Sequence, residues 1–271
     1  MGIGAMVGVL AVDVGNTVTR LGLFASGELR ATWDATTPAI MTSDEARLVV
    51  ANFLDAMRRE ASRSDGQEVP APTDAILSCV VPDLTDLWAA ALQAECGRRP
   101  LVVGPGLKTG IKMRYRDPAE VGSDRVADLA AARVDYEAPL IVVDLGTTTN
   151  FEVIDAEGTF QGGIIAPGLA LGAKSLAQAA ARLPVIELKA PASVIGTSTR
   201  EAMQAGIVMG EVARIDGLID MVAAELGCEA GIVITGANAT ALAALLRHEA
   251  CADDTLTLRG LGRLYDMNRR K

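Results

Sequence analysis

The stretch Val9–Thr19, VLAVDVGNTVT, decides the fold, because the chain repeats it over Leu140–Asn150 as LIVVDLGTTTN. In each copy a short apolar run leads into Asp, then Gly, then Thr. At a constant offset the matched pairs are Asp13 and Asp144, Gly15 and Gly146, Thr17 and Thr148, and the turn glycines Gly27 and Gly158. A short motif recurs easily by chance, but a match that keeps the following turn indicates an internal duplication.

Each copy predicts a strand, a tight turn, a second strand, another turn and a third strand. The apolar run before the Asp is typical of a short buried strand. The Gly permits close backbone approach, and the Thr and Asn side chains suit a turn that offers hydrogen-bond donors. The runs 21–24 and 151–154 form the second strand, and the glycine turn after each closes a hairpin.

Two Asp-x-Gly-x-Thr turns have a plain chemical use. Backbone N–H groups and hydroxyls can hold phosphate oxygens, and the carboxylates can hold or orient a cation that neutralises phosphate charge. Two such turns facing one cleft would grip a nucleotide from both sides. The alternative is that each turn merely ends a strand. The stretch Val103–Thr109 lacks the spacing of a Walker A loop, and no GxGxxG opens a helix after a strand.

The rest of the chain predicts an α/β protein of two lobes, residues 1–115 and 116–271. In the first we expect a helix over Asp44–Ala61, a strand over Ala75–Pro82 ended by proline, a helix over Leu84–Cys96 and a strand over Leu101–Val103. In the second we expect a helix over Asp124–Val134, a strand and glycine turn over Gly162–Gly168, a helix over Leu171–Arg182, a mostly helical Thr199–Leu226 and a strand and turn over Gly231–Asn238. The last turn suits an adenine or ribose, or is simply a βα connection.

Composition excludes several classes of function. The net charge is −9 without a basic cluster, so we expect no nucleic-acid partner. No uninterrupted run of 18 apolar residues predicts a membrane span, and the N-terminus lacks the basic region of a signal peptide. The four cysteines form no CxxC pair and predict reduced, mostly buried thiols in a cytoplasmic protein. The single histidine, His248, lies on a predicted helix without a nucleophile motif, so we expect no hydrolytic triad.

The catalytic candidate is the segment Gly122–Arg125, which follows a proline-containing loop and begins a helix. Helix N-termini favour anions, Arg125 can pair with a substrate carboxylate, and Asp124 can accept or orient a hydroxyl proton. In phosphoryl transfer positioning matters more than base strength. Taken alone, the segment favours a simpler reading, in which Asp124 complements the helix dipole and Arg125 makes a surface ion pair.

In order and spacing from about Val9 to Asn268, the chain resembles the type III pantothenate kinase family, within the acetate/sugar kinase, Hsp70 and actin superfamily. The segments that carry the resemblance are Asp13–Thr17, Ser78–Pro82, Asp117–Arg125, Asp144–Thr147, Gly162–Gly168, Leu183–Pro184, Ile195–Thr199, Ala202–Gly206 and Leu256–Leu261. The resemblance implies two similar lobes of ribonuclease H-like (actin-like ATPase) fold with a nucleotide cleft between them. It implies transfer of the ATP γ-phosphate to pantothenate, the first step toward coenzyme A.

The resemblance also implies the site residues. Those toward the ATP phosphates are Asp13, Val14, Gly15, Asn16, Thr17, Val18, Thr19, Arg20 and Thr147. Those toward pantothenate are Tyr115, Gly122, Ser123, Asp124, Arg125 and Thr199, with Asp124 as the catalytic base and Arg125 toward the substrate carboxylate. Asp144 matches the ligand of a monovalent cation, K⁺ or NH₄⁺, and Mg²⁺ accompanies ATP. The family resemblance further implies a homodimer with its substrate pocket close to the interface.

Some positions depart from the family pattern. They are Val18, Thr148, Asn150, Gly172 and Ala237, and all fall on the expected nucleotide side. They leave two alternatives to a pantothenate kinase: a catalytically weak paralogue that acts as a ligand-binding regulatory protein, and a kinase for another small hydroxy compound. The presence of Asp13, Asp124, Arg125 and Asp144 favours an active kinase.

Overall fold

The computed structural model of the chain describes residues 8–63, 69–180 and 182–269. The segment 1–7, for which no signal peptide is expected, lies outside these residues. The chain divides into two compact units. Unit 1 comprises Met1–Gly110, Asp117–Ala131 and Leu256–Lys271, and unit 2 comprises Ile111–Arg116 and Ala132–Thr255.

Unit 1 contains a mixed sheet with the strand order β3-β2-β1-β4-β5. The strands are β1 (Gly8–Val14), β2 (Val18–Ala25), β3 (Glu28–Thr36), β4 (Pro72–Cys79) and β5 (Leu101–Val102). Strand β1 is antiparallel to β2 and parallel to β4, and every residue of β1 is buried. This central strand carries Asp13 one residue before its end.

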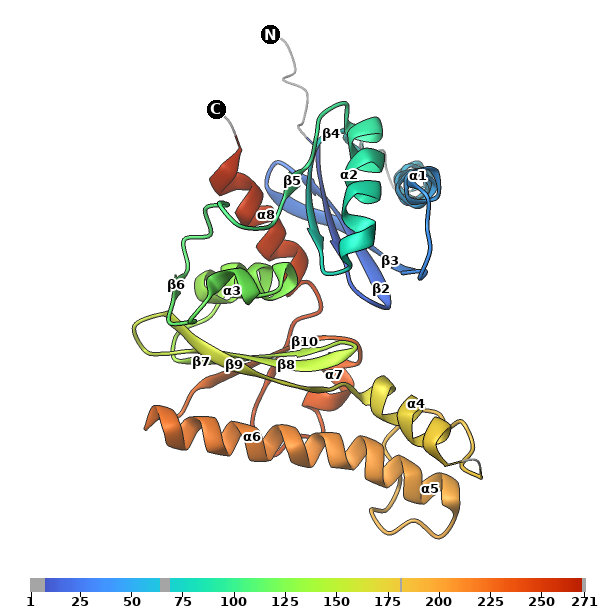
Figure 1. Cartoon of the computed structure of the whole chain (residues 1–271), viewed down its shortest axis with the longest axis vertical. Coiled ribbons are helices and arrows are strands. Elements are labelled where there is room, and N and C mark those ends of the chain that lie inside the picture. The colour runs from blue at the N-terminus through green and yellow to red at the C-terminus, as the bar shows by residue number, and fades with distance from the viewer. Residues whose placement is uncertain (1–7, 64–68, 181, 270–271) are drawn as a thin grey trace. The chain divides into compact units, whose positions relative to one another are not determined.

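Helices cover both faces of the unit 1 sheet. On one face α1 (Ser43–Ala61) and α2 (Pro82–Cys96) enclose an apolar core that includes Leu10, Val12, Phe53 and Trp88. On the other face α8 (Leu256–Asn268) contacts β1, β2 and β4 (Figure 1). Pro82 occupies the first turn of α2, where its missing N–H is not needed, so it begins a helix rather than ending the strand directly.

Unit 2 contains a second mixed sheet with the order β11-β10-β7-β8-β9-β6. The strands are β6 (Lys112–Met113), β7 (Leu140–Leu145), β8 (Thr148–Ile154), β9 (Thr159–Pro167), β10 (Gly231–Gly236) and β11 (Cys251–Ala252). Strand β7 is antiparallel to β8 and parallel to β10. It therefore holds the same central place as β1 does in unit 1.

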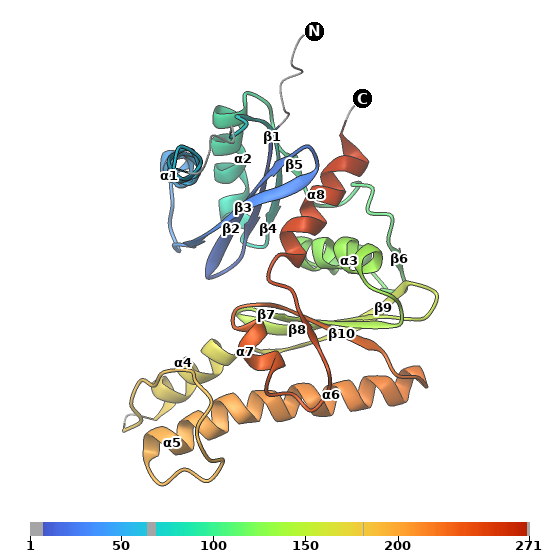
Figure 2. The same ribbon diagram turned by 180° about the vertical axis from the view of Figure 1, so that it is seen from behind.

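One long helical rod covers the apolar face of the unit 2 sheet. It consists of α5 (Thr199–Gln204), a π-helical segment (Ala205–Met209) and α6 (Gly210–Leu226), and α6 runs along the sheet (Figure 2). The core between them includes Ile141, Val143, Ile215 and Ile219. The other helices are α4 (Leu169–Ala179), α7 (Ala239–Ala243) and α3 (Ser123–Asp135), whose last turn is counted with unit 2.

The two sheets repeat one topology. The order β9-β8-β7-β10-β11 in unit 2 corresponds strand by strand to the order β3-β2-β1-β4-β5 in unit 1. The duplication predicted from the sequence is therefore a structural one. The turns differ in length: residues 15–17 join β1 to β2, whereas Gly146 and Thr147 alone join β7 to β8. Accordingly, the Gly15 N–H bonds to the Val18 carbonyl oxygen and the Gly146 N–H bonds to the Thr148 carbonyl oxygen. Thr148 is therefore the structural equivalent of Val18, which corrects the sequence match of Thr148 to Thr17.

Several other expectations need correction. The compact units differ from lobes divided at residues 115 and 116, because 117–131 and 256–271 group with the N-terminal unit. Arg247 and His248 lie in the loop after α7 and not on a helix, and His248 Nε2 lies 2.8 Å from Asp220 Oδ1. All four thiols are free, but only Cys96 is fully buried, and Cys228 and Cys251 are exposed. Among the described residues no helix is long and apolar enough to cross a membrane.

Unit 1 depends on a close helix crossing that only glycine permits. A Cβ on Gly260 of α8 would lie 1.8 Å from the carbonyl oxygen of Ala127 on α3. Nearby, the Thr257 hydroxyl donates a 2.6 Å hydrogen bond to the buried Asp128 Oδ1. The discontinuous segments of unit 1 are thus held by direct contact between α3 and α8.

We predict that Gly260→Ala lowers the free energy of unfolding by about 1–3 kcal/mol, because the added methyl group must push two backbones apart. Urea denaturation measures the change. Gly217→Ala on α6 is the matched control, since its Cβ would meet no atom within 4 Å. That control should be neutral or should stabilise by up to about 1 kcal/mol through helix propensity. Equal stability of the two variants would contradict the close crossing.

Candidate active site

The site in unit 1 is built around a row of polar side chains across three strands. Asp13 on β1 is paired in register with Arg20 on β2 and with Ser78 on β4. Residues paired across strands share a face, and Val12 and Val14 point into the core on the other side. The row therefore lies on the face that carries α8, at the end of the central strand.

Asp13 is a buried carboxyl group with a perturbed pKa. Burial, and then the nearby charge of Asp124, raise the pKa of Asp13 to about 6, while Ser78 and Arg20 oppose the rise. Its Oδ1 atom is buried and has no hydrogen-bond partner. An orphaned buried carboxylate oxygen next to a second carboxylate is typical of a site that awaits a cation or a proton.

Asp124 is held beside this row by the start of α3. The buried Ser78 hydroxyl donates a 2.9 Å hydrogen bond to Ser123 Oγ, which ties β4 to the first residue of the helix. The Asp124 Oδ1 atom accepts a 2.8 Å bond from the Arg125 backbone N–H. A Cβ on Gly122 would lie 2.5 Å from the same oxygen, so glycine leaves room for this carboxylate. Burial raises the pKa of Asp124, which makes it a stronger base.

Arg125 is buried, with only 5% of its surface exposed. The alternative that it makes a surface ion pair is therefore wrong. Its charge lowers the pKa of Asp124 against the larger effect of burial. A guanidinium and two carboxylates thus lie in one desolvated region of unit 1.

The remaining residues expected at the phosphates differ in what they can offer. Gly15, Asn16 and Thr17 form the turn and Val18 begins β2, and of these Asn16, Thr17 and Val18 are exposed. Val14 is fully buried in the core, so only its backbone can face a ligand. The Thr19 hydroxyl shares a 2.8 Å buried hydrogen bond with Thr37 Oγ1, which favours a structural role. The turn itself therefore offers mainly backbone groups and the Asn16 and Thr17 side chains.

Unit 2 repeats the polar row with different chemistry. Asp144 on β7 is paired with Asn150 on β8 and Thr235 on β10. The Asn150 Oδ1 and Thr235 Oγ1 atoms are buried without hydrogen-bond partners. Where unit 1 places Arg20 beside its Asp, unit 2 places a neutral amide. The row offers three kinds of oxygen, namely carboxylate, amide and hydroxyl.

The turn after β7 is packed against the start of α4. The Gly168 N–H donates a 3.0 Å bond to the Thr147 carbonyl oxygen, and a Cβ on Gly168 would lie 2.3 Å from the Gly146 carbonyl oxygen. The N-terminus of α4 follows immediately, and helix N-termini favour negative charge. Thr147 therefore lies at a place where the backbone favours an anion.

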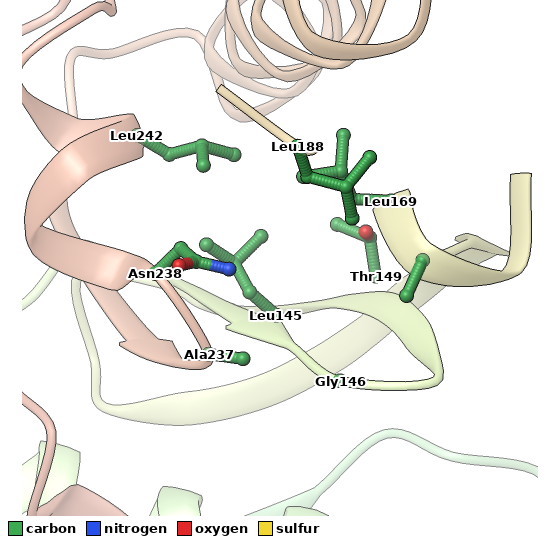
Figure 3. A pocket seen from close by; sticks show the side chains of 9 residues that line it. Leu145, Gly146, Thr149, Leu169, Leu188, Ala237, Asn238 and Leu242 are labelled. Atoms are coloured by element: carbon green, nitrogen blue, oxygen red, sulfur yellow. The ribbon is translucent and has the colours of Figure 1, made fainter. Parts of the chain in front are cut away.

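A small, mostly apolar pocket lies beside this turn in unit 2. Leu169, Leu188 and Thr149 lie on one side of it and Asn238 and Leu242 on the other (Figure 3). Leu145, Gly146, Ala170 and Ala237 complete the lining. Gly236, with φ of 90°, and Asn238, with φ of 63°, bend the chain after β10 so that the Ala237 N–H reaches the Leu145 carbonyl oxygen at 2.8 Å.

The other two residues expected at the substrate belong to unit 2. Tyr115 is half-buried and its ring stacks on Phe160 with centroids 5.6 Å apart and an angle of 8°. Thr199 is exposed at the first position of α5. Gly122, Ser123, Asp124 and Arg125 all belong to unit 1.

Comparison with known proteins identifies the family. The family model described as type III pantothenate kinase matches residues 9–221. This chain belongs to the type III pantothenate kinase family. A type III pantothenate kinase from Moorella thermoacetica is 38% identical over 259 residues, which are 96% of this chain and 99% of that protein. One from Thermomicrobium roseum is 40% identical over 257 residues, 95% of this chain and 96% of that protein.

Solved structures agree on the fold. A conserved Baf family transcriptional activator from Campylobacter jejuni has a TM-score of 0.58 and 18% identity, with 96% of this chain and 98% of that one covered. The ethanolamine utilization protein EutJ from Carboxydothermus hydrogenoformans has a TM-score of 0.53 and 16% identity, with 95% and 89% covered. The chain has the α/β fold of the actin-like ATPase and sugar kinase superfamily.

For this member of the type III pantothenate kinase family, sequence reasoning overlooked three polar side chains. From the sequence Ser78 is predicted only as part of a strand, whereas in the structure it is paired with Asp13 and bonds to Ser123. Thr235 and Asn150 were not proposed as ligands. The signal that could have found them is strand pairing, because each lies opposite an already identified Asp.

We predict that the buried Asp13 destabilises the fold above pH 6. Because its folded pKa of about 6 exceeds the ordinary value of 3.8, the folded state binds the proton more tightly, and stability declines as pH rises from about 4 to about 6. Asp13→Asn should therefore raise the free energy of unfolding at pH 8 by on the order of 2–3 kcal/mol, and by much less at pH 4. Urea denaturation at both pH values tests this. The control is Asp86→Asn, on the exposed side of α2. A gain in Asp13→Asn that is the same at both pH values would refute the raised pKa.

Proposed function

We propose that this chain catalyses the ATP-dependent phosphorylation of pantothenate to 4'-phosphopantothenate, the first step of coenzyme A biosynthesis. The family membership supports the reaction, and relatives that bear the name type III pantothenate kinase match 96% of this chain. The single structural observation that carries the proposal is the closeness of the buried Asp13 carboxyl group to the half-buried Asp124, whose charge contributes to the raised pKa of Asp13 in unit 1. A phosphoryl-transfer site needs one group near the phosphates and one near the accepting hydroxyl.

Asp124 is proposed as the base on the pantothenate hydroxyl. Its raised pKa favours proton acceptance, and the Arg125 N–H fixes one of its oxygens. The Arg125 guanidinium is proposed to bind the pantothenate carboxylate, with Gly122 and Ser123 shaping the segment. Tyr115 and Thr199 are proposed as further pantothenate contacts from unit 2.

ATP is proposed to use the two duplicated turns. The segment Asp13–Arg20 would hold phosphate oxygens, chiefly through the backbone of residues 15–17, and Thr147 would add a group beside the α4 N-terminus. The pocket lined by Leu145, Leu188 and Leu242 would take the adenine ring of ATP, because mostly apolar walls with few polar atoms suit such a ring.

The residues present fit the two cations that we propose. The orphaned Asp13 Oδ1 fits Mg²⁺ accompanying ATP, since Mg²⁺ prefers carboxylate oxygens together with substrate phosphates. Binding of this positive charge would lower the pKa of Asp13. The row of Asp144, Asn150 and Thr235 fits a monovalent cation, K⁺ or NH₄⁺, because each side chain contributes an oxygen and two of these are orphaned.

A homodimer is proposed from the exposed apolar surface of unit 2. Large apolar side chains are exposed on β9, α4 and the chain between α4 and α5, namely Ile165, Leu171, Leu176, Val185, Val194 and Ile195. No residue of α4 is buried. A surface that exposes many large apolar side chains is typical of a protein interface. Thr199, which begins α5, would then contact substrate near that interface.

A cytoplasmic location is also proposed. Cys79, Cys96, Cys228 and Cys251 are all free thiols, as is usual in a reducing compartment.

We predict pantothenate-dependent release of ADP from Mg·ATP, dependent on added potassium and measured by a coupled assay. Asp124→Asn should lower kcat by about 10²- to 10⁴-fold, the usual contribution of a positioned base, with the KM for ATP little changed. Asp117→Asn, which removes a carboxylate that caps the short helix at Pro118–Glu120, is the control outside the reacting groups.

Undiminished turnover in Asp124→Asn would support the kinase activity but refute the proposal that Asp124 is the catalytic base. Binding of pantothenate or ATP by calorimetry without any turnover would instead indicate the regulatory paralogue. Turnover with another hydroxy compound in place of pantothenate would reassign the acceptor.

A further inference from the structure

Two polar residues of the helical rod in unit 2, one on each side of its π-helical segment, bond to the chain that forms the pocket walls. Gln204 is the last residue of α5 before Ala205–Met209, and Glu211 follows that segment in α6. Each of these polar residues is only 5% exposed. π-Helical segments occur frequently at functional sites. The sequence motif Ala202–Gly206 overlaps the first two residues of this one and has no role in the function proposed above.

Gln204 holds the chain that supplies one wall of the pocket. Its Nε2 atom donates a 3.0 Å hydrogen bond to the Glu187 carbonyl oxygen. The next residue, Leu188, lines the pocket and points into it opposite Leu242 (Figure 3). The segment around Leu188 has no helix or strand of its own, so this bond fixes a wall that regular structure does not.

Glu211 holds two other parts of the lining. Its Oε1 accepts a 2.6 Å bond from the buried Thr149 hydroxyl, and Thr149 lines the pocket. Its Oε2 pairs with Arg214, which also donates a 2.7 Å bond to the Pro167 carbonyl oxygen. Pro167 lies two residues before Leu169, and Leu169 and Ala170 complete that side of the pocket.

A role in stability alone does not account for this arrangement. Glu211 is a buried carboxylate paired with a half-buried arginine, and burying a carboxylate in an ion pair seldom stabilises a fold more than a well-packed apolar side chain of the same volume, so packing alone does not require Glu211. The bonds from the rod instead converge on Leu188, Thr149 and the start of α4, which are separate parts of the lining of one pocket.

We propose that Gln204 and Glu211 are positioning residues for the nucleotide, which set the affinity for ATP by fixing the pocket walls from behind without touching the ligand. This rests on the proposed function, in which the pocket takes the base of ATP. It follows that their loss should act on ATP and leave pantothenate binding unaffected.

The test compares Gln204→Leu and Glu211→Ala with the wild-type full-length chain. We expect the KM for ATP, and the Kd for ATP measured by calorimetry without pantothenate, to rise about tenfold, as expected when a buried hydrogen bond is removed. The KM for pantothenate and the kcat at saturating ATP should stay within about twofold. Glu211→Gln should restore most of the ATP affinity, because its amide oxygen can still accept from Thr149.

Gln93→Leu, at an exposed position of α2, is the matched control for Gln204→Leu. A fall in kcat and melting temperature with an unchanged KM for ATP would show a merely structural role and overturn the proposal, as would an equal rise in both KM values. If Glu211→Ala fails to fold, Gln204→Leu and Glu211→Gln decide the matter. If the wild-type chain binds ATP but does not phosphorylate pantothenate, the proposed kinase activity is refuted. The ATP affinities of the variants would still test whether Gln204 and Glu211 position the nucleotide.

Discussion

The structure depends on a carboxyl group placed near the end of the central strand of each sheet, and in unit 1 this placement is costly because Asp13 is buried. Asp13 and Asp144 hold equivalent places in equivalent sheets. A buried carboxylate is unfavourable unless its surroundings or a ligand compensate the charge. Several elements surround this charge. They are the neighbouring strands, the glycine turn after each Asp and, in unit 1, the helix α3 that carries Asp124. A cation or a proton bound at a buried carboxylate such as Asp13 would therefore lower the free energy of the folded state.

The two units use the same plan for different chemistry. In unit 1 the Asp has Arg20 and Ser78 beside it and Asp124 nearby. Arg20 and Ser78 favour its charged form, whereas Asp124 favours its protonated form. In unit 2 the Asp has neutral oxygen-bearing neighbours, Asn150 and Thr235. In the function that we propose, the first set acts on the phosphates and the hydroxyl proton, and the second set holds a monovalent cation. Duplication followed by change at the neighbouring positions explains how one motif can supply both.

Much of the fold could be predicted from sequence because it follows from local patterns. The duplicated strand and turn, the helix α1 and the helix α3 were expected within a few residues. What could not be predicted depends on contacts distant in sequence. The burial of Arg125, the grouping of α8 with the N-terminal segment and the bonds of Gln204 and Glu211 leave no periodic signal. The turn lengths could not be predicted either. In unit 2 the turn after β7 is one residue shorter than its counterpart in unit 1, and the turn after β8 is longer. The two differences cancel, so Gly158 still matches Gly27 at the constant sequence offset.

The most direct test of this account is the number of protons released when Mg·ATP binds, measured by calorimetry in buffers of different ionisation enthalpy. Asp13, with a pKa of about 6, should be partly protonated in the free protein at pH 6 and should ionise when the cation and phosphates bind. The account predicts that wild-type protein releases up to about half a proton more than Asp13→Asn at pH 6, and that the difference vanishes at pH 8. Equal proton release by the two proteins at pH 6 would contradict it.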